Sequence, residues 1–262
     1  GNANSVTSTQ SGNVSDSFVT QTGDSSRAIV NQSASDSTST IEQTANSQAA
    51  QVTQSGSGQS STVRQSASAG ADLSTPELGS VTTATAIVTQ SGSDNISTID
   101  QEGTSNLARV AQSGVNSVSD VLQTGNNVVT QVTQSASDST SDIIQSGTKL
   151  FARVNQSGTN QTSTINQSSP DSPFAAVRGT VAVTQSGTDN VSNVVQSGDV
   201  VTPGVSSGFG FTNFPIEGVQ NSPMASVIQN GTGNEADVDQ IGTSSLLRST
   251  QTGTSNESVV LQ

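Results

Sequence analysis

Glutamine recurs at every eleventh position along almost all of this chain. The series has 20 members, and 16 of its 19 intervals have the same length of eleven, the other three being 25, 18 and 33. A repeat of fixed length constrains the architecture more strongly than any local propensity does. The repeated residues are Gln10, Gln21, Gln32, Gln43, Gln54, Gln65, Gln90, Gln101, Gln112, Gln123, Gln134, Gln145, Gln156, Gln167, Gln185, Gln196, Gln229, Gln240, Gln251 and Gln262.

The residues around each glutamine alternate in character. Val or Ile stands two residues before it in 18 of the 20 units, the exceptions being Ser8 and Ser249. A small residue usually stands four residues before it, and Gly or Ala usually follows two residues after it. Alternation with a period of two predicts a strand with one buried face, and β-branched residues favour strands. We expect the glycine to open a turn, because Gly reaches positive φ at little cost.

This alternation identifies candidate structural positions, and no catalytic, metal-binding or cofactor-binding residue is predicted. The positions expected to stack in the core are Gln21, Gln32, Gln43, Gln54, Gln101, Gln112, Gln123, Gln134, Gln145, Gln156, Val110, Val121, Val132, Ile143 and Val154. The glycines expected in turns are Gly92, Gly103, Gly114, Gly125, Gly147 and Gly158.

The repeat units alternate between two classes, the first beginning at Gln10 and the second at Gln21. Four residues after the glutamine, the first class has Asp, Asn or Gly in eight of ten units, which is typical of a tight turn with a left-handed residue. The second class has Ser, Ala or Lys there more often, so we expect a looser turn. All three long intervals follow a second-class glutamine. The sequence therefore predicts a 22-residue rung of two strands, about ten rungs, and insertions near 69–84, 168–179 and 198–224 on one edge.

The predicted fold is an all-β solenoid that forms a single domain over residues 1–262. Equivalent glutamines would stack roughly 4.8 Å apart, and each amide would donate to the next. The repeat continues to Gln262 with Val260 in phase, so we expect no capping element there and head-to-tail stacking into an open filament. Val205 and Ile216 also fall on the Val/Ile phase, which leaves an eleventh, degenerate rung open.

Composition excludes several classes of function. Only 29% of residues are hydrophobic and 10% are charged, and the chain contains no His and no Cys. It therefore lacks the commonest general base, the commonest metal ligand and any disulfide. A net charge of −13 with seven basic residues speaks against binding to nucleic acid or to anionic lipid. No segment is long and apolar enough for membrane insertion, and the absence of a signal peptide is expected of a mature secreted chain.

The repeat resembles the curlin repeat of curli amyloid subunits, Ser-x5-Gln-x-Gly-x2-Asn-x-Ala-x3-Gln. The segment Gln101-Glu102-Gly103-Thr104-Ser105-Asn106-Leu107-Ala108-Arg109-Val110-Ala111-Gln112 matches every fixed position of its core. The resemblance covers nearly the whole chain. It implies an extracellular, cell-surface fibre subunit of a bacterial biofilm matrix that is secreted unfolded, polymerises with itself, and depends on a nucleator and on secretion machinery at the outer membrane.

Two other functions remain as alternatives. Some β-helices cleave polysaccharides with a cluster of carboxylates, but no cluster interrupts the repeat here, so we expect no enzyme. An ice-binding solenoid needs flat rows of threonine on an outer face. The outward pairs before first-class glutamines are mixed, and one of them is Arg109 with Ala111. The alternative to a fibre subunit is therefore a soluble surface solenoid of one of these two kinds.

Some residues follow the repeat without an evident role. Acidic residues at the first-class turn either bridge a cation through oxygen ligands or are simply good turn residues, which we favour. Arginines recur at one outward position of first-class units, and aspartates recur at the matching position of second-class units. We expect these arginines and aspartates to form surface ion pairs between rungs. The apolar residues of 198–224 either pack over their own edge, which we favour, or form an adhesive site. The charged residues are Asp36, Asp94, Asp138 and Asp189 in the turns, Arg109, Arg153 and Arg248 in one strand class, and Asp120 and Asp142 in the other.

Overall fold

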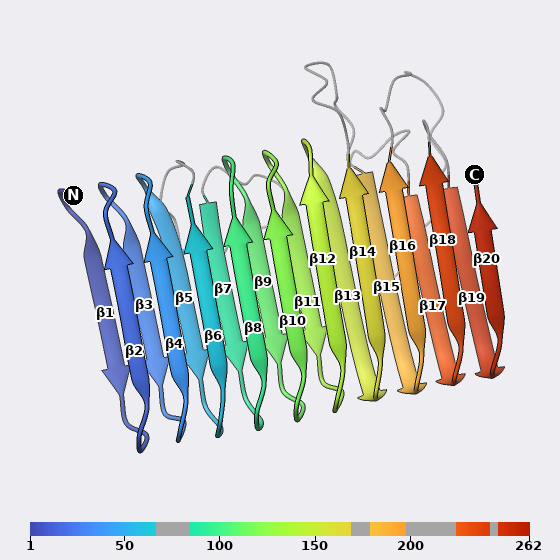
Figure 1. Ribbon diagram of the computed structural model, residues 1–262, viewed down its shortest axis with the longest axis horizontal. Coiled ribbons are helices and arrows are strands. Elements are labelled where there is room, and N and C mark those ends of the chain that lie inside the picture. The colour runs from blue at the N-terminus through green and yellow to red at the C-terminus, as the bar shows by residue number, and fades with distance from the viewer. Residues whose placement is uncertain (67–83, 169–178, 198–223, 242–245) are drawn as a thin grey trace.

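The computed structural model describes residues 1–66, 84–168, 179–197, 224–241 and 246–262. These residues form two parallel sheets of ten strands each (Figure 1). The chain alternates between the sheets, so that odd-numbered strands make one and even-numbered strands the other. We call them the odd sheet and the even sheet, and we number the rungs from 1 (β1 and β2) to 10 (β19 and β20). The predicted all-β solenoid of two-stranded rungs is confirmed.

The strands are short and evenly spaced. The odd sheet consists of β1 (Ser5–Gln10), β3 (Arg27–Gln32), β5 (Gln48–Gln54), β7 (Ala84–Gln90), β9 (Leu107–Gln112), β11 (Val129–Gln134), β13 (Leu150–Thr159), β15 (Gly179–Thr188), β17 (Met224–Thr232) and β19 (Leu246–Thr254). The even sheet consists of β2 (Asp16–Gln21), β4 (Thr38–Gln43), β6 (Ser60–Gln65), β8 (Ile96–Gln101), β10 (Val118–Gln123), β12 (Thr140–Ser146), β14 (Thr162–Ser168), β16 (Val191–Ser197), β18 (Glu235–Ile241) and β20 (Glu257–Leu261).

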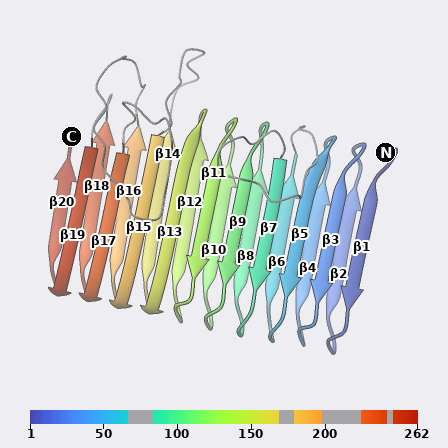
Figure 2. The same ribbon diagram turned by 180° about the vertical axis from the view of Figure 1, so that it is seen from behind.

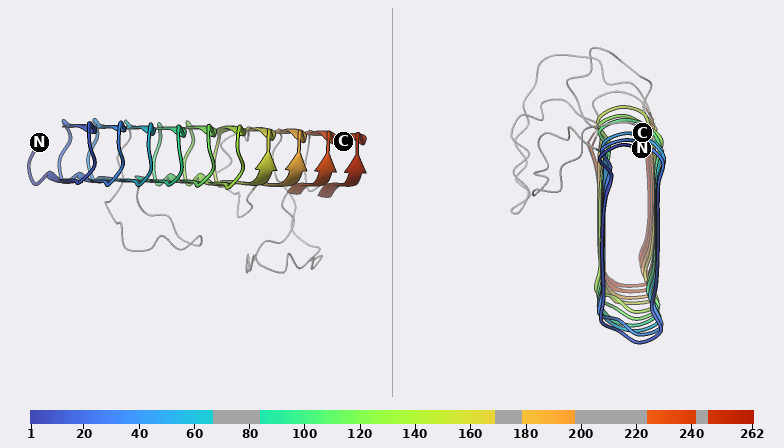
Figure 3. Two further views of the ribbon diagram at one scale, coloured as in Figure 1. Left: turned by 90° about the horizontal axis from the view of Figure 1, so that it is seen from below. Right: turned by 90° about the vertical axis from the view of Figure 1, so that its left-hand side faces the viewer.

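The solenoid is a flattened tube. Figure 2 shows from behind the same regular series of strands, with the two termini at opposite ends. Figure 3 shows the rungs stacked along the long axis and, in the end-on view, a narrow loop whose two long sides are the sheets. The side chains that point inward from the two sheets form the core between them. The side chains that point outward line two broad outer faces.

The strands pair without any slip in register. Val110 faces Val132, and Gln112 faces Gln134. A slip of one residue would turn every core side chain outward, so the buried positions maintain this register. The register also spans the longest interval, where Gln185 pairs directly with Gln229. The described stack therefore has ten rungs, with none between β15 and β17. The additional rung that the sequence left open for this interval is not present in the stack.

The long segments between units occupy one kind of connection. Residues 67–83, 169–178 and 198–223 each join an even strand to the next odd strand. Val205, Ile216 and the expected apolar cluster lie outside the described residues. Four residues that we expected at the margins of the insertions belong to strands instead. They continue the strand pairing of the previous rung, as Ala84 does with Gln48 and Gly179 with Leu150. The four are Ala84, Ser168, Gly179 and Met224.

The core is thin and made of small and β-branched residues. Between the two end rungs, the Val and Ile residues two positions before the glutamines are buried in both sheets, as Val110, Val121 and Ile143 illustrate, whereas Val19 and Val260 in the end rungs are only partly buried. Four positions before the glutamines, the odd sheet mostly places Ala and the even sheet mostly places Ser. Small residues at this position let the two sheets approach closely without a large apolar core.

Both classes of turn have a residue with left-handed backbone conformation at the same position. This corrects the expectation that the second-class turn is looser. Four residues after the glutamine, φ is 54° at Asp94 in the first class and 58° at Ser105 in the second. Lys149, in a second-class turn, also has φ of 56°. The turn residue adopts this conformation even where Ser or Lys is poorly suited to it. The stacking of identical turns, rather than the residue type, sets the geometry.

Candidate functional site

The glutamines form two continuous hydrogen-bonded ladders, one in each sheet. In the odd sheet, the Nε2 of Gln90 donates to the Oε1 of Gln112 at 2.9 Å, and Gln112 donates in the same way to Gln134 at 2.9 Å. This ladder runs unbroken from Gln10 to Gln251. The ladder of the even sheet runs from Gln21 to Gln240.

Every predicted stacking residue lies in this core arrangement. Gln21, in the first rung, is only half-buried. The other predicted glutamines are at most 1% exposed, and they are Gln32, Gln43, Gln54, Gln101, Gln112, Gln123, Gln134, Gln145 and Gln156. The predicted aliphatic residues are fully buried, and they are Val110, Val121, Val132, Ile143 and Val154.

Gln112 also links its own rung to the one before. The Nε2 of Gln112 donates to the carbonyl oxygen of Ile96, which begins a strand of the opposite sheet, at 3.0 Å. It reaches the carbonyl oxygen of Ser117, in the turn that follows, at 3.0 Å. The buried amide is therefore satisfied along the stack and across it, which removes the penalty of burying a polar group. The ladder links the two sheets as well as successive rungs.

One substitution alters the ladder of the even sheet. Thr130 occupies a position where the odd sheet usually has Ala. Its hydroxyl accepts from the Nε2 of Gln123 at 3.0 Å and donates to the Oε1 of Gln145. The direct bond from Gln123 to Gln145 is correspondingly long, at 3.2 Å. A hydroxyl inserted between two glutamines thus preserves the continuity of the ladder.

A third polar row lies at the first-class turns, five residues after the glutamine, and it was not among the predicted site residues. The Nδ2 of Asn95 donates to the carbonyl oxygen of Gly114 in the next rung at 2.9 Å. Its Oδ1 accepts from the backbone N–H of Ser117 at 3.0 Å. Both partners lie in the turn of the next rung, so this side chain links one turn to its copy one rung on. The Asn of the curlin motif was the signal for this row, since it stands at the matching place in second-class turns, as at Asn106.

The turn glycines are needed for close approach between rungs. A Cβ on Gly114 would lie 1.5 Å from the carbonyl oxygen of Ala136, and one on Gly125 would lie 1.7 Å from that of Gly147. Of the predicted turn glycines, Gly92, Gly103, Gly147 and Gly158 have positive φ, between 111° and 135°. A side chain with this backbone path would therefore displace the next rung.

The even sheet also buries a column of serine hydroxyls. Four positions before the glutamine, eight serines have a buried Oγ that makes no hydrogen bond with any described residue. An unpaired buried hydroxyl is destabilising by about 1–3 kcal/mol. These eight are Ser17, Ser39, Ser61, Ser97, Ser119, Ser141, Ser163 and Ser192.

The two ends of the described stack differ in hydrogen-bonding polarity. Each glutamine donates toward the later rung, so the Oε1 of Gln10 is unused by the ladder at the β1 end. At the other end, the Nε2 of Gln251 donates to the carbonyl oxygens of Glu235 and Asn256 and to no further glutamine among the described residues. Among the described strands, β1 pairs only with β3, and β20 only with β18. Val6, a core position in rung 1, is 51% exposed because no described rung covers it.

The acidic row of the first-class turns does not bring its carboxylates together. Asp94 and Asp138 are separated by the rung of Asn116, whose Nδ2 donates to the Oδ1 of Asp138 at 3.0 Å. Aspartates two rungs apart lie roughly 10 Å from each other. Within the described ranges, no group of three or more acidic, His or Cys side chains is arranged to hold a metal ion.

Comparisons with known proteins add no identity to these features. No protein-family model matches the chain, and no curated protein has a significantly similar sequence. Within the described ranges, the chain forms no helix with the length and apolar character that a membrane span requires.

Proposed function

We propose that the protein is the structural subunit of a curli-like, extracellular amyloid fibre that serves in biofilm matrix, adhesion and surface attachment. The observation that carries this proposal is the pair of unbroken, in-register glutamine ladders with a fixed direction. Parallel strands stacked in register with amide ladders are the structural unit of amyloid. The resemblance to the curlin repeat supports the extracellular role, with a nucleator and outer-membrane secretion machinery as partners.

The ends of the described stack suit head-to-tail addition of a second copy. A donor at Gln251 would meet the free Oε1 of Gln10 in the next copy, and β19 would pair with β1 as it pairs with β17. The exposed Val6 would then be covered by a rung, as Ala28 is covered one rung further in. Because the donor end meets the acceptor end, the contact is heterologous and generates an open filament.

Electron microscopy and fibre diffraction of the purified chain test this proposal. We expect long unbranched filaments with a reflection at about 4.7–4.8 Å along the filament axis. Monomers that persist at high concentration, with no such reflection, would refute the fibre.

A matched pair of variants tests whether the stack itself assembles. Val110→Pro removes a backbone donor from the central strand β9 and should delay assembly strongly. Val110→Ile keeps the donor and places at that position a residue that other units carry, such as Ile143, so it should assemble like the wild type. Equal assembly kinetics of the two variants would show that this strand is not part of the fibre core.

A second candidate is a soluble surface solenoid whose odd sheet binds ice or acts on a polysaccharide. The observation in its favour is a pair of outward rows of hydroxyls, in which Thr53 and Ser55 are followed in the next rung by Thr89 and Ser91. Ala111 interrupts the threonine row. Ice-recrystallisation and polysaccharide-cleavage assays on freshly purified monomer test it, and activity in either without filaments would favour it over the fibre.

A further inference from the structure

The two outer faces of the solenoid carry opposite charges. The described strands of the odd sheet contain four arginines and no acidic residue, and those of the even sheet contain nine acidic residues and one arginine. The arginines of the odd sheet are Arg27, Arg109, Arg153 and Arg248. The acidic residues of the even sheet are Asp16, Glu42, Asp100, Asp120, Asp142, Glu235, Asp237, Asp239 and Glu257.

These charged side chains point away from the core, because they occupy the positions that alternate with buried ones. Arg109 and Arg248 are exposed on the odd sheet, and Asp120 is exposed on the even sheet. The two sets lie on opposite sides of a core about 10 Å thick. The arginines therefore cannot pair with Asp120 and Asp142 within one molecule, which corrects the expectation of pairing between rungs.

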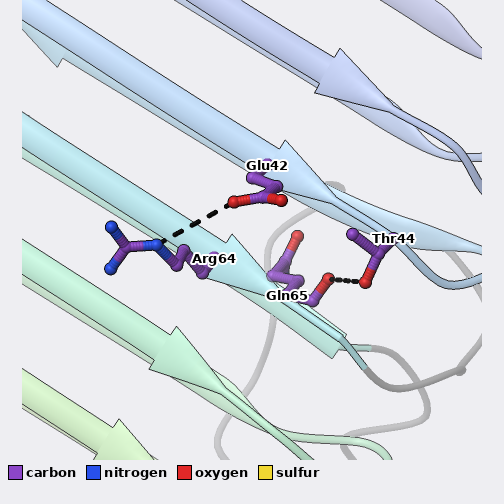
Figure 4. Close-up of polar contacts among 4 residues, drawn as sticks. All are labelled: Glu42, Thr44, Arg64 and Gln65. Carbon is purple, nitrogen blue, oxygen red and sulfur yellow. Dashed lines mark hydrogen bonds and ion pairs between the residues drawn. The ribbon is translucent and has the colours of Figure 1, made fainter.

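The even face neutralises little of its own charge. Among the described residues one ion pair joins two side chains: Arg64 Nε lies 3.9 Å from Glu42 Oε2 on neighbouring strands of this face (Figure 4). Partial burial, together with the adjacent Asp120, raises the pKa of Asp142. Partial burial followed by the charge of Glu102 raises the pKa of Asp100. Stacked carboxylates on this face repel one another and would be stabilised by an opposing positive surface.

We propose that the odd-sheet face of one molecule docks on the even-sheet face of a second copy, so that filaments associate side by side through complementary charge. The inference rests on the proposed fibre. The two faces have the same length and the same rise per rung, so their charged rows run parallel when two filaments lie along each other. The odd face is also lined beside its glutamines by short side chains such as Thr53 and Ser55, which permit close approach.

This contact joins unlike faces and leaves one of each kind free. Further filaments can therefore add on both sides, and the product is a layered bundle rather than a closed pair.

Varying the ionic strength distinguishes the attraction between the two faces from the net repulsion between two chains that each carry a charge of −13. At physiological salt, charges are screened over about 8 Å, so a docked molecule responds mainly to the face it touches. At about 0.01 M salt the range grows to about 30 Å, and the whole-chain repulsion opposes approach. At about 1 M salt the attraction itself is screened. We therefore expect bundling to be greatest at intermediate ionic strength.

The decisive variant is Arg109→Gln/Arg248→Gln. Gln131 naturally occupies the same outward position one rung after Arg109, so the substitution suits the strand. The matched control is Ser25→Asp/Ser105→Asp, which changes the net charge by the same amount at left-handed turn positions where Asp94 shows that Asp is accommodated. Filament formation is followed by the diffraction reflection, and bundling by filament width in electron micrographs and by low-speed sedimentation.

We expect the arginine variant to form filaments as the wild type does, with the bundled fraction reduced about tenfold or more, because many weak contacts act together along a filament. The control should bundle normally. Charge exchange provides a second test: filaments of Arg109→Glu/Arg248→Glu and of Asp120→Lys/Asp142→Lys should each bundle poorly, and their mixture should bundle again.

Several outcomes would overturn the inference. Unchanged bundling in the arginine variant would do so, as would an equal loss in the turn control. A third outcome is that wild-type filaments bind a short DNA duplex through these arginines, while the arginine variant still bundles normally. That result would identify an anionic polymer as the partner instead. If the wild type forms no filaments, the proposed function fails, whereas face pairing still predicts salt-dependent association of the soluble protein in analytical ultracentrifugation.

Discussion

Replacing Gln112 by leucine isolates the contribution of one amide in the ladder. Its Nε2 donates to Gln134 Oε1 at 2.9 Å and to the carbonyl oxygens of Ile96 and Ser117 at 3.0 Å. Its Oε1 accepts from Gln90 Nε2 at 2.9 Å. Gln112→Leu keeps a side chain of similar size and removes all of these contacts.

The expected loss follows from these contacts. The two N–H groups of Nε2 share three acceptors, so together with the accepted bond the amide makes the equivalent of three hydrogen bonds. At a net of about 0.5–1.5 kcal/mol each, they contribute roughly 3 kcal/mol. Gln134 Oε1 then lacks its ladder donor, whereas Gln90 Nε2 keeps the carbonyl oxygens of Ser60 and Asn95. Burying leucine returns up to about 2 kcal/mol. We therefore expect Gln112→Leu to lower the free energy of unfolding by about 1–3 kcal/mol.

Gln131→Leu is the matched control, because Gln131 lies in the next strand and faces outward from the odd sheet. Its free energy of unfolding should change by no more than about 0.5 kcal/mol. Both are measured by guanidinium unfolding followed by circular dichroism, at a concentration where sedimentation shows monomers. Equal destabilisation by the two variants would refute the ladder as a source of stability.

A double-mutant cycle sharpens this test. Gln112→Leu/Gln134→Leu removes two neighbouring amides that bond directly to each other. The second substitution should cost less than it does alone, because its partner is already lost, and a coupling energy of about 0.5–3 kcal/mol is expected. Strictly additive effects would mean that the amides act independently.

Three further predictions concern the turns, the core and the acidic face. Val14→Gly should raise amide protection from hydrogen exchange in rung 1 about fivefold, because Val14 has φ of 53°; unchanged protection would argue against strain there. Ser119→Ala should raise the free energy of unfolding by about 1 kcal/mol in guanidinium titrations. The Oγ of Ser119 is buried without a partner among the described residues, and Ala236 occupies the equivalent position in another rung. Destabilisation by Ser119→Ala would therefore reveal a partner such as an ordered water. Burial and Asp120 raise the pKa of Asp142 above its ordinary value of 3.8, so the associated stability is present below that value and is lost as pH rises through the folded-state pKa. Asp142→Asn should therefore be more stable than the wild type at pH 7 and gain less from acidification, and a less stable variant at pH 7 would contradict this assignment.

The solenoid and most of its core could be predicted from the amino-acid sequence alone. The period-two alternation around Val110 and Gln112 is local, and it repeats at a fixed distance, so strand, turn and stacking partner can all be inferred from one unit. The position of the long segments also follows from counting, because each interrupts the period after a second-class glutamine such as Gln65. No long-range contact had to be known for these conclusions.

Other features depend on contacts between rungs, and only the folded structure reveals them. Ser105 and Lys149 adopt left-handed backbone because the turns above and below impose it, which their residue types do not indicate. The pairing of Gln185 with Gln229 excludes an additional rung between them, although the period allowed one.

The direction of the ladders and the separation of charge onto two faces likewise appear only in three dimensions. Arg109 and Asp120 stand one repeat unit apart in the sequence, and the repeat alone suggested that they pair. The chain reverses between their strands, and the shared core places their side chains on opposite faces. The sequence sets the pattern along each strand, whereas the stacking of rungs determines which patterns meet.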